Sequence, residues 1–461
     1  MFPHAKKIHM IGIGGIGMSA LAKLFLHLEK EVSGSDAHAS VFTEDLARRG
    51  ARVHEGHDTS HLTDTTHLVI YSSAIPETNP ERQQAVALGI PQMSYAQALG
   101  EMTKHYSTIV VTGTHGKSTT TALLGLMLEA GGYDPTVLVG SVVPGFVDGN
   151  LRLGKGRFFV VEGCEHQANM LNLEPEMIVL TSIEKDHLDY YRDLEHIRET
   201  FQTFVDKLSH KGLVILNADD AVSNTLGVQH AVQYGFNSTA HYRAQDRQTQ
   251  SGSQRVSVSR QVPPENLGEM TLNIPGAFNV SNVLAATAAA MELGVPFEVC
   301  QRVAESFNGI WRRFERVGTW QGHEVISDYG HHPTAIRATV QAAREFFPDK
   351  KIVLCFQPHQ HSRTAAMFDE FVEALQSADV TVIPEIYRVE GRTETQEVSS
   401  RDLVEKILEL SPDSSVHYAE HLEHAKMVLE NLCSDSGPCI VVIQGAGNID
   451  DLARNLKDLG T

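Results

Sequence analysis

Residues 107–130 constrain the fold of this chain more than any other segment. An apolar run at 107–112 predicts a buried strand, TGTHGKSTT follows at 112–120, and a helix is predicted to continue to residue 130. Glycines in such a turn let backbone N–H groups face phosphates, the lysine reaches the β and γ phosphates, and the serine offers an oxygen to Mg²⁺. Although Val111 replaces the first glycine of the common pattern, the segment predicts an α/β fold that binds a nucleoside triphosphate through Thr112, Gly113, Thr114, His115, Gly116, Lys117, Ser118 and Thr119.

A second glycine-rich turn lies near the start of the chain. Residues 8–13 predict a strand and residues 14–28 a helix, and between them Gly12, Gly14 and Gly17 fit the spacing G-x-G-x-x-G. Asp36 follows where a ribose-binding acid is expected. Taken alone, this pattern indicates a nicotinamide-dependent dehydrogenase, or a turn that only lets a helix pack on a strand. Beside the triphosphate loop, it predicts a second phosphorylated ligand that carries a diphosphate.

Strands and helices alternate along the rest of the chain. Further strands are predicted at 66–72, 157–161, 177–182 and 213–217, and the polar stretch 240–263 is expected to form short strands or loops. In the last third, strands at 324–327, 351–356, 379–384 and 438–443 alternate with helices at 333–346, 364–377, 400–410 and 421–432. Such alternation predicts right-handed, mostly parallel sheets. We expect three domains: a Rossmann-like domain at 1–106, a central ATP-binding domain at 107–312 and a second Rossmann-like domain at 313–461.

Composition excludes several classes of protein. The 461 residues include 38 Lys and Arg against 57 Asp and Glu, a net charge of −19, which disfavours binding to nucleic acid. The 5 cysteines form no CxxC pair, so neither a disulfide framework nor a zinc ribbon is expected, and a reducing compartment fits. No apolar stretch approaches about 18 residues, so no membrane span is expected. We expect a cytoplasmic protein that is a monomer or a weak dimer.

Motifs along nearly the whole chain resemble, in order, those of the Mur ligase family. The similarity covers the glycine turn at 12–17, SGSD at 33–36, SSAI at 72–75, TGTHGKSTTT at 112–121, EGCE at 162–165, IEKDH at 183–187, GAFNVSN at 276–282, FNG at 307–309, RRFE at 312–315, DYGHHPT at 328–334, FQPH at 356–359 with RT at 363–364, and QGAGN at 444–448. Three positions depart from the family pattern. Phe278 stands where a His is usual, GCEHQAN with His166 and Gln167 replaces an acid- and serine-containing block, and Gln360 replaces an Arg.

The resemblance implies an ATP-dependent ligase that activates a carboxylate as an acyl phosphate and joins it to an amine, with Mg²⁺ or Mn²⁺ as the metal. Within the family, residues 356–364 are more similar to the member that adds L-alanine to UDP-N-acetylmuramate in peptidoglycan synthesis. The alternative is the recycling member that attaches a preformed tripeptide to the same sugar. Two rivals come from other classes: a nicotinamide oxidoreductase, which leaves the loop at 112–121 without a role, and a P-loop ATPase that acts as a binding module.

The resemblance also implies a role for each candidate residue. The UDP sugar is expected at Gly12, Gly14, Gly15, Gly17, Ser35, Asp36, Ser72 and Ser73. Lys117 is expected to be catalytic, as a fixed positive charge beside the transferring phosphoryl group. The metal ligands are expected to be Ser118, Glu162 and His187, with Asp186 orienting His187 or a water. Glu162 and His187 are also expected to be catalytic. On the nucleotide side, Asn279 and Asn282 are expected at the adenine, and Arg313 or its neighbour Arg312 at phosphate.

In the last domain, chemistry is expected at the ends of the strands. The resemblance implies that Asp328 and His331 are catalytic and that the substrate is contacted by Tyr329, His331, His359 and Arg363. Arg363 suits the carboxylate of the amino acid, and either His331 or His359 positions the amine or accepts its proton. His332 is expected to cap the following helix. Because the candidate residues belong to different domains, closure about a hinge at 308–313 is expected.

Overall fold

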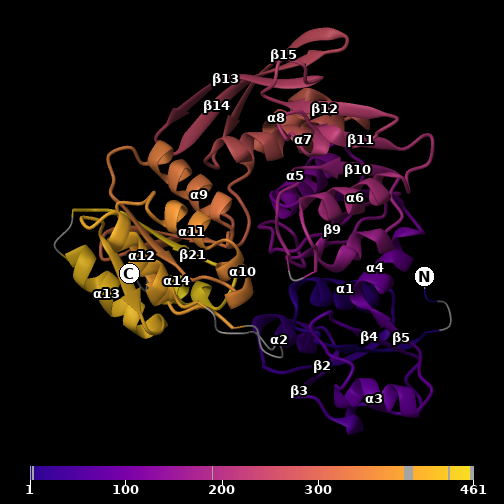
Figure 1. The fold of residues 1–461 in the computed structure, drawn as a ribbon. Coiled ribbons are helices and arrows are strands. Elements are labelled where there is room, and N and C mark those ends of the chain that lie inside the picture. The colour runs from indigo at the N-terminus through magenta and orange to yellow at the C-terminus, as the bar shows by residue number, and fades with distance from the viewer. Residues whose placement is uncertain (1, 3–4, 189, 389–397, 435–436, 457–461) are drawn as a thin grey trace. The chain divides into compact units, whose positions relative to one another are not determined.

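Three β-sheets, each flanked by helices, form the three α/β domains that the sequence predicts (Figure 1). The computed structural model describes residues 2, 5–188, 190–388, 398–434 and 437–456. These residues form two compact units: the first contains 1–184, 195–242 and 284–303, and the second contains 185–194, 243–283 and 304–461. The domain limits at residues 106 and 312 stay predictions.

The N-terminal sheet is parallel throughout and belongs to the first unit. Its strands are β1 (Lys7–Ile11), β2 (Glu31–Asp36), β3 (Arg52–Glu55), β4 (Leu68–Tyr71) and β5 (Gln92–Ser94), in the order β3-β2-β1-β4-β5. The helices are α1 (Ile16–His27), α2 (Val41–Arg48), α3 (Pro80–Ala87) and α4 (Tyr95–Thr103), with a 3₁₀ turn η1 (Thr59–His61). The predicted strands at 8–13 and 66–72 and the helix at 14–28 are confirmed. Because β1 lies between β2 and β4, the carboxyl ends of these three strands meet.

The central sheet of the first unit has the order β12-β11-β10-β6-β9-β7-β8. Its strands are β6 (Ser107–Thr112), β7 (Thr136–Leu138), β8 (Leu151–Arg152), β9 (Phe158–Gly163), β10 (Met177–Leu180), β11 (Leu213–Asn217) and β12 (Ala231–Gly235). The other elements are α5 (Lys117–Ala130), α6 (Leu194–Val205), η2 (His166–Asn172) and η3 (Ser223–Thr225). Since β6 pairs in parallel with both β9 and β10, the turn after β6 lies beside the ends of those strands.

The polar stretch after residue 240 corrects one expectation. Instead of short strands or loops, it forms three strands of 9 residues each: β13 (Tyr242–Gln250), β14 (Ser253–Gln261) and β15 (Pro264–Leu272). Only one face carries apolar side chains, such as Val256, Val258, Met270 and Leu272, which are buried. The opposite face carries polar side chains, so these strands contain few apolar residues and their length is not evident in the sequence. Helices α7 (Ala277–Glu292) and α8 (Phe297–Ser306) follow.

The C-terminal sheet of the second unit has the order β16-β17-β21-β18-β19-β20 and is parallel except for β16. Its strands are β16 (Glu315–Trp320), β17 (His323–Asp328), β18 (Ile352–Phe356), β19 (Val380–Pro384), β20 (Val416–Ala419) and β21 (Ile440–Gln444). The helices are α9 (Pro333–Phe346), α10 (His361–Ala366), α11 (Phe368–Leu375), α12 (Ser400–Leu410), α13 (Leu422–Ser434) and α14 (Ile449–Asn455). The predicted elements are confirmed, except that the helix at 364–377 is two helices with a break at Met367.

Alternate residues of the C-terminal strands face two different cores. Leu354 and Val442 pack with α9, α11 and α12, whereas Val353 and Val441 pack with α13 and α14. Such two-sided burial explains why these strands are continuous apolar runs in the sequence. It also leaves polar side chains to the strand ends, where the candidate residues lie.

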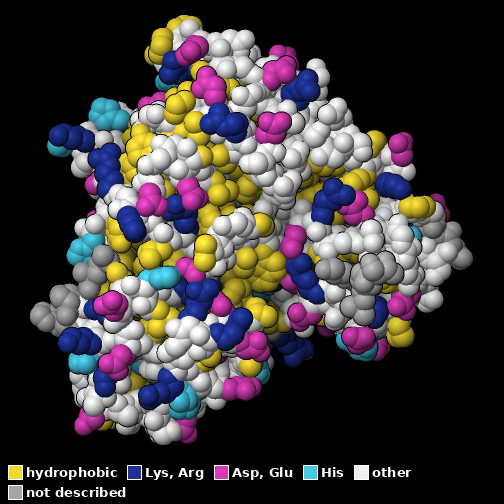
Figure 2. Space-filling model, turned by 180° about the vertical axis from the view of Figure 1, so that it is seen from behind, with side chains coloured by type: hydrophobic (Ala, Val, Ile, Leu, Met, Phe, Trp, Pro, Cys, Tyr) yellow, Lys and Arg dark blue, Asp and Glu magenta, His cyan; other side chains and the backbone are white. Residues whose placement is uncertain are grey.

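The surface has no field of one charge on the face drawn in Figure 2, where Lys and Arg are interspersed with Asp and Glu. Within the described residues, no helix is both long and apolar enough to span a bilayer.

Candidate functional site

The turn between β6 and α5 has the geometry of an anion cradle. Gly113 has φ +130° and Gly116 has φ +80°, values that side-chain-bearing residues rarely adopt. A Cβ on Gly113 would lie 2.2 Å from Thr181 Oγ1, so no other residue fits there. The N-cap of α5 is Gly116, which has no side chain to satisfy the first helical N–H groups. The helix therefore opens on backbone donors that suit phosphate oxygens.

Lys117 lies folded against this turn. Its Nζ donates to the carbonyl oxygens of Gly113 at 2.6 Å and Thr114 at 3.1 Å, and it lies 2.9 Å from Glu165 Oε2. Burial alone would lower the pKa of Lys117, but the charge of Glu165 outweighs it, so the pKa is raised above its ordinary value. The ammonium group is therefore charged at any physiological pH. An anionic ligand that binds at this turn can therefore replace Glu165 as the charged partner of Lys117.

Ser118 and Glu162 provide the oxygen atoms for a divalent cation. Ser118 Oγ lies 3.1 Å from Glu162 Oε2, and Glu162 Oε1 accepts the N–H of Gly140 at 2.5 Å. Neighbouring ligands in an octahedral Mg²⁺ site with bonds of about 2.1 Å are about 3.0 Å apart. A hydroxyl and a carboxylate at this separation therefore fit Mg²⁺. His187, the third predicted ligand, belongs to the second unit.

The N-terminal glycine turn is closed by a carboxylate rather than by a cation. Gly14 N donates to Asp36 Oδ2 at 2.8 Å, and a Cβ on Gly14 would lie 2.9 Å from the same oxygen. Gly12 has φ +78°, and a Cβ there would lie 3.0 Å from Ser72 Cβ. The fold thus brings Gly12, Gly14, Asp36 and Ser72 to one edge of the sheet, next to the exposed Ser73. Asp36 partly serves the turn itself, which the sequence pattern did not indicate.

Ser35 lies beneath that edge. It is fully buried, and its hydroxyl donates to Glu81 Oε2 at 2.5 Å and lies 3.0 Å from His57 Nδ1. Burial raises the pKa of Glu81, but hydrogen bonds from His9, Ser35 and His61 lower it to about 2. The structure therefore places Ser35 in a buried polar network, and direct contact of Ser35 with substrate stays a prediction.

In the second unit, three of the predicted residues lie around the carboxylate of Asp186. Arg363 Nη2 lies 3.0 Å from Asp186 Oδ1, and the ring nitrogens of His331 and His187 lie 3.9 and 3.8 Å from Oδ2. Burial raises the pKa of Asp186, but the charge of Arg363 and the backbone N–H of His187, which donates to Oδ1 at 2.7 Å, help to lower it below its ordinary value, so the group is ionised. The predicted orienting role of Asp186 fits this arrangement, and it extends to Arg363.

The same cluster contains His359 and Tyr329. The His331 ring lies 5.9 Å from that of His359 and 5.4 Å from that of Tyr329, and Arg363 Nη1 lies 3.3 Å from His359 Nδ1. Burial, followed by the charge of Arg363, lowers the pKa of His331 well below its ordinary value. His331 is therefore a neutral imidazole at pH 7, the form that can accept a proton.

The contacts of Asp328, of the two neighbouring arginines and of His332 show that these predicted residues differ in what they do. Asp328 accepts the N–H groups of Phe314 at 2.8 Å and Gly330 at 2.7 Å, so its carboxylate shapes the loop that carries His331. Arg312 is buried and donates to the carbonyls of Gly445 and Gly447, whereas Arg313 is partly exposed, 4.9 Å from the Tyr329 ring. Of the two arginines, Arg313 is the better placed for a ligand. His332 caps α9 by accepting the N–H of Thr334, as predicted.

Asn279 and Asn282 lie on one face of α7. Asn282 Nδ2 donates to Asn279 Oδ1 at 3.2 Å, and Asn279 Nδ2 donates to Pro275 O at 2.7 Å. Asn279 lies in the first turn of the helix and is not its N-cap. Phe278 is 38% exposed, so an aromatic face stands beside the amide pair. An aromatic ring and amides suit an adenine.

Sequence reasoning gave no role to Glu165 and did not single out Tyr95. Glu165 was visible in the EGCE motif, but its pairing with Lys117 spans 48 residues and has no local signal. The Tyr95 hydroxyl lies so close to Gly17 that a Cβ on this glycine would be only 2.7 Å from it. Burial and the charge of Glu162 raise the pKa of Tyr95. Tyr95 therefore packs against the N-terminal glycine turn at Gly17.

The chain matches three family models in sequence order. Their descriptions are "Mur ligase family, catalytic domain" for residues 7–107, "Mur ligase middle domain" for 111–290 and "Mur ligase, glutamate ligase domain" for 312–447. A UDP-N-acetylmuramate–L-alanine ligase from Desulfotalea psychrophila is 39% identical over 465 residues, which cover 100% of this chain and 99% of that protein. A ligase of the same name from a Sulfurihydrogenibium species is 36% identical over 454 residues, 98% of this chain and 97% of that protein.

Solved structures give the same grouping. The UDP-N-acetylmuramate–alanine ligase of Thermotoga maritima has a TM-score of 0.83 to this chain at 28% identity, with 98% of each chain covered. A murein peptide ligase from Psychrobacter arcticus has a TM-score of 0.73 at 23% identity, again over 98% of each chain. At this identity, the comparison with the murein peptide ligase shows only that the two proteins share a fold.

Proposed function

This chain belongs to the Mur ligase family, and from that premise we propose that it joins L-alanine to UDP-N-acetylmuramate with ATP, in the cytoplasmic synthesis of peptidoglycan precursors. Relatives named for this activity match along nearly their whole length, whereas the murein peptide ligase shares the fold. Neither rival class, the oxidoreductase or the ATPase module, uses both glycine turns.

One observation carries the proposal: a charged lysine, a hydroxyl and a carboxylate surround the open end of α5. Lys117 is held 2.9 Å from Glu165, and Ser118 lies 3.1 Å from Glu162. A triphosphate bound at this turn would meet backbone N–H groups, a fixed positive charge and a magnesium site. Mg²⁺ held by Ser118 and Glu162 would neutralise charge on the phosphate oxygens. Mn²⁺ suits the same oxygen ligands.

The reaction follows from these groups and the cluster of the second unit. The γ-phosphoryl group passes to a carboxylate oxygen of the muramate: its bond to ADP breaks, a new P–O bond forms, and Lys117 stabilises the charge. The amine then attacks the carbonyl carbon of the acyl phosphate, and inorganic phosphate leaves. The amine proton passes to His331, whose imidazole is neutral at pH 7, or to His359. The hinge at residues 308–313 stays part of the proposal.

A small cavity supports alanine as the amino acid. It has a volume of about 120 Å³ and is lined by Asp186, His187, Leu188, Gln360, Ser362, Arg363, Ala366 and Met367. Arg363 Nε and Nη2 both donate to Asp186 Oδ1, at 3.2 and 3.0 Å. A cavity of this size has room for an amino acid as small as alanine.

A phosphate-release assay tests the proposal. Purified protein with ATP, Mg²⁺ and UDP-N-acetylmuramate is given L-alanine, L-serine, glycine or the tripeptide in separate reactions. We expect release of phosphate that depends on both the sugar and an amine and is fastest with L-alanine, with the amide product confirmed by mass spectrometry. Fastest release with the tripeptide would replace the proposal with the recycling reaction. Release without any amine would reduce it to an ATPase.

A further inference from the structure

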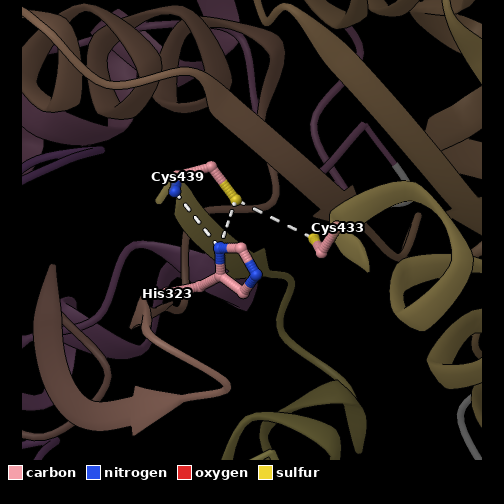
Figure 3. A group of neighbouring side chains, drawn as sticks. All are labelled: His323, Cys433 and Cys439. Atoms are coloured by element: carbon pink, nitrogen blue, oxygen red, sulfur yellow. Dashed lines mark hydrogen bonds between the residues drawn. The ribbon is translucent and has the colours of Figure 1, made fainter. Parts of the chain in front are cut away.

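Two cysteines and a histidine meet in the second unit, away from the candidate residues (Figure 3). His323 opens β17, Cys439 directly precedes β21, and Cys433 lies in the last turn of α13. β17 and β21 are parallel neighbours with Glu324 opposite Ile440, so His323 and Cys439 share the amino edge of the sheet. Asp328 ends the same strand, about 16 Å away at about 3.3 Å per residue. The cluster is therefore separate from the proposed ligase site.

All three side chains are buried and point toward one another. His323 is 5% exposed, and both cysteines are 1% exposed, in a core that also contains Trp320, Leu429 and Val441. His323 Nδ1 lies 3.1 Å from Cys439 Sγ, and Cys439 Sγ lies 3.8 Å from Cys433 Sγ (Figure 3). One atom from each residue lies within 4.8 Å of the other two. The apolar residues around the cluster limit its access to bulk solvent and lower the local dielectric constant.

The distances fit a metal better than a disulfide. A disulfide requires a sulfur separation of about 2.0 Å, so the 3.8 Å gap would have to close by almost half. In a tetrahedral zinc site with Zn–S bonds of about 2.3 Å and Zn–N bonds of about 2.0 Å, neighbouring sulfurs are about 3.8 Å apart. A sulfur and a nitrogen in such a site are about 3.5 Å apart. The sulfur pair is already at the zinc separation, and the Sγ–Nδ1 pair must open by about 0.4 Å.

Hydrogen bonds hold the cluster together in the metal-free protein. One of them joins the thiol groups of Cys433 and Cys439. His323 Nδ1 also accepts the N–H of Cys439 at 3.2 Å, which satisfies the ring without a metal. On metal binding, the Nδ1 lone pair would coordinate the cation instead of accepting this N–H.

We propose that His323, Cys433 and Cys439 form a structural site for a thiophilic d¹⁰ cation, Zn²⁺, that ties α13 to the amino edge of the C-terminal sheet. Binding forms two Zn–S bonds and one Zn–N bond, and the two thiol protons leave to solvent. Three protein ligands leave the fourth tetrahedral position to a water molecule. The sequence gave no sign of this site, because cysteines six positions apart and a histidine more than 100 positions earlier match no zinc-binding pattern.

Cobalt(II) is the first probe, because thiolate ligation gives a charge-transfer absorption that oxygen ligands do not give. Full-length protein is reduced, stripped with a chelator and titrated with Co²⁺. We expect a near-ultraviolet band that saturates at one equivalent and is displaced by Zn²⁺. Cobalt bound at Ser118 and Glu162 would not produce this band, so the readout is independent of the ligase reaction.

Variants then assign the band to its ligands. Cys433→Ala and Cys439→Ala should each abolish it, and the matched control Cys300→Ala, a buried cysteine of α8 outside the cluster, should retain it. Far-ultraviolet circular dichroism checks that each variant is folded. In the unaltered protein, native mass spectrometry should show one zinc with the loss of two protons, and Zn²⁺ should raise the melting temperature by several degrees. A band that survives in Cys433→Ala, or no zinc uptake by reduced protein that instead forms a Cys433–Cys439 disulfide in air, would overturn the proposal.

Discussion

The two glycine turns share a backbone plan but differ in charge. Each follows a buried strand in the middle of its sheet, opens a helix, and contains a glycine with positive φ, Gly12 at +78° and Gly113 at +130°. In the first turn, the carboxylate of Asp36 accepts a backbone N–H of the turn. In the second, the ammonium group of Lys117 is held by two backbone carbonyls and by Glu165.

The difference teaches that the side chain beside a glycine turn decides what the turn binds. A carboxylate that accepts the N–H of Gly14 repels phosphate locally, so the first turn suits hydroxyl groups and a diphosphate at its remaining donors. A lysine with an exchangeable partner suits a triphosphate, because the phosphates can replace Glu165 as its counter-ion. We therefore expect the same strand–turn–helix unit to bind a sugar nucleotide at one place and the phosphoryl donor at another.

Lys117→Ala should separate the two turns most sharply. Without the fixed charge, kcat should fall by about 10³-fold or more, because electrostatic stabilisation of the transferring group is lost. The dissociation constant for UDP-N-acetylmuramate, measured by calorimetry, should stay within about twofold, because the sugar is expected at the other turn. Lys104→Ala, an exposed lysine at the end of α4, is the control. If sugar binding disappears with the lysine, the two turns do not form separate sites.

Glycine substitutions compare the backbone demands of the turns. Gly113→Ala should lower the free energy of unfolding by about 3 kcal/mol, because it combines a positive φ with a contact of 2.2 Å to Thr181. Gly15→Ala should cost less than about 0.5 kcal/mol, since Gly15 has φ −61° and the nearest contact of a Cβ would be 3.5 Å. Urea unfolding of both variants checks this. Equal losses would mean that the conformation of Gly113 carries no special cost.

Glu165→Gln tests whether the lysine's partner is exchangeable. The buried ammonium group loses its charged neighbour, so the free energy of unfolding should fall by about 2 kcal/mol. An ATP analogue should restore part of the loss, because its phosphates replace the carboxylate. Thermal unfolding with and without the analogue measures this. Glu101→Gln, which breaks the exposed pair with Lys104, should change stability by less than about 0.5 kcal/mol.

The pH dependence should come from the second unit and not from the turns. Lys117 has a raised pKa and stays protonated across the neutral range, so it contributes no acid limb. His331 has a pKa lowered well below 6.5, so its imidazole stays neutral until the pH falls below that value. We expect kcat to be flat from about pH 8 to well below pH 6.5, and to fall by up to about tenfold per pH unit only below the lowered pKa of His331. A limb centred above pH 7 would contradict a neutral His331.

The same lowered pKa predicts a loss of stability in acid. The unfolded chain protonates His331 near pH 6.5, but the folded chain resists protonation, so the unfolded state binds more protons below that pH. Stability should therefore fall as the pH drops from about 6.5, and His331→Gln should flatten this part of the profile. Urea midpoints measured between pH 5 and pH 8 test it.

Asp36→Asn should give the smallest effect and sharpen the description of the first turn. The amide oxygen can still accept the N–H of Gly14, so only the charge is lost. We expect the dissociation constant for UDP-N-acetylmuramate to change by no more than about fivefold, or about 1 kcal/mol. Asp36→Ala, which removes the acceptor, should weaken binding further. Calorimetry that shows the same loss for both variants would assign the effect to the charge.

Most of the fold could be predicted from local sequence patterns. The strands of the last domain are apolar on both faces, and the turns carry glycines that nothing else can replace, so both are visible in short windows of sequence. The strand at 253–261 is longer than the short strands expected there, because Val256 and Val258 are its only apolar residues and give the sequence little to mark its ends. The helix at 364–377 was too long because the break at Met367 has no Pro or Gly to mark it.

By itself, the sequence determined the α/β class, the two phosphate-type turns, the family and most of the residues at the strand ends, because each depends on neighbours within a few positions. Only the tertiary structure decided which partner each residue has. It paired Lys117 with Glu165, directed Asp36 to Gly14, buried Arg312 while leaving Arg313 partly exposed, and placed His323 beside two cysteines. Partners separated by tens of residues leave no periodic trace in the chain, since the packing of whole elements brings them together.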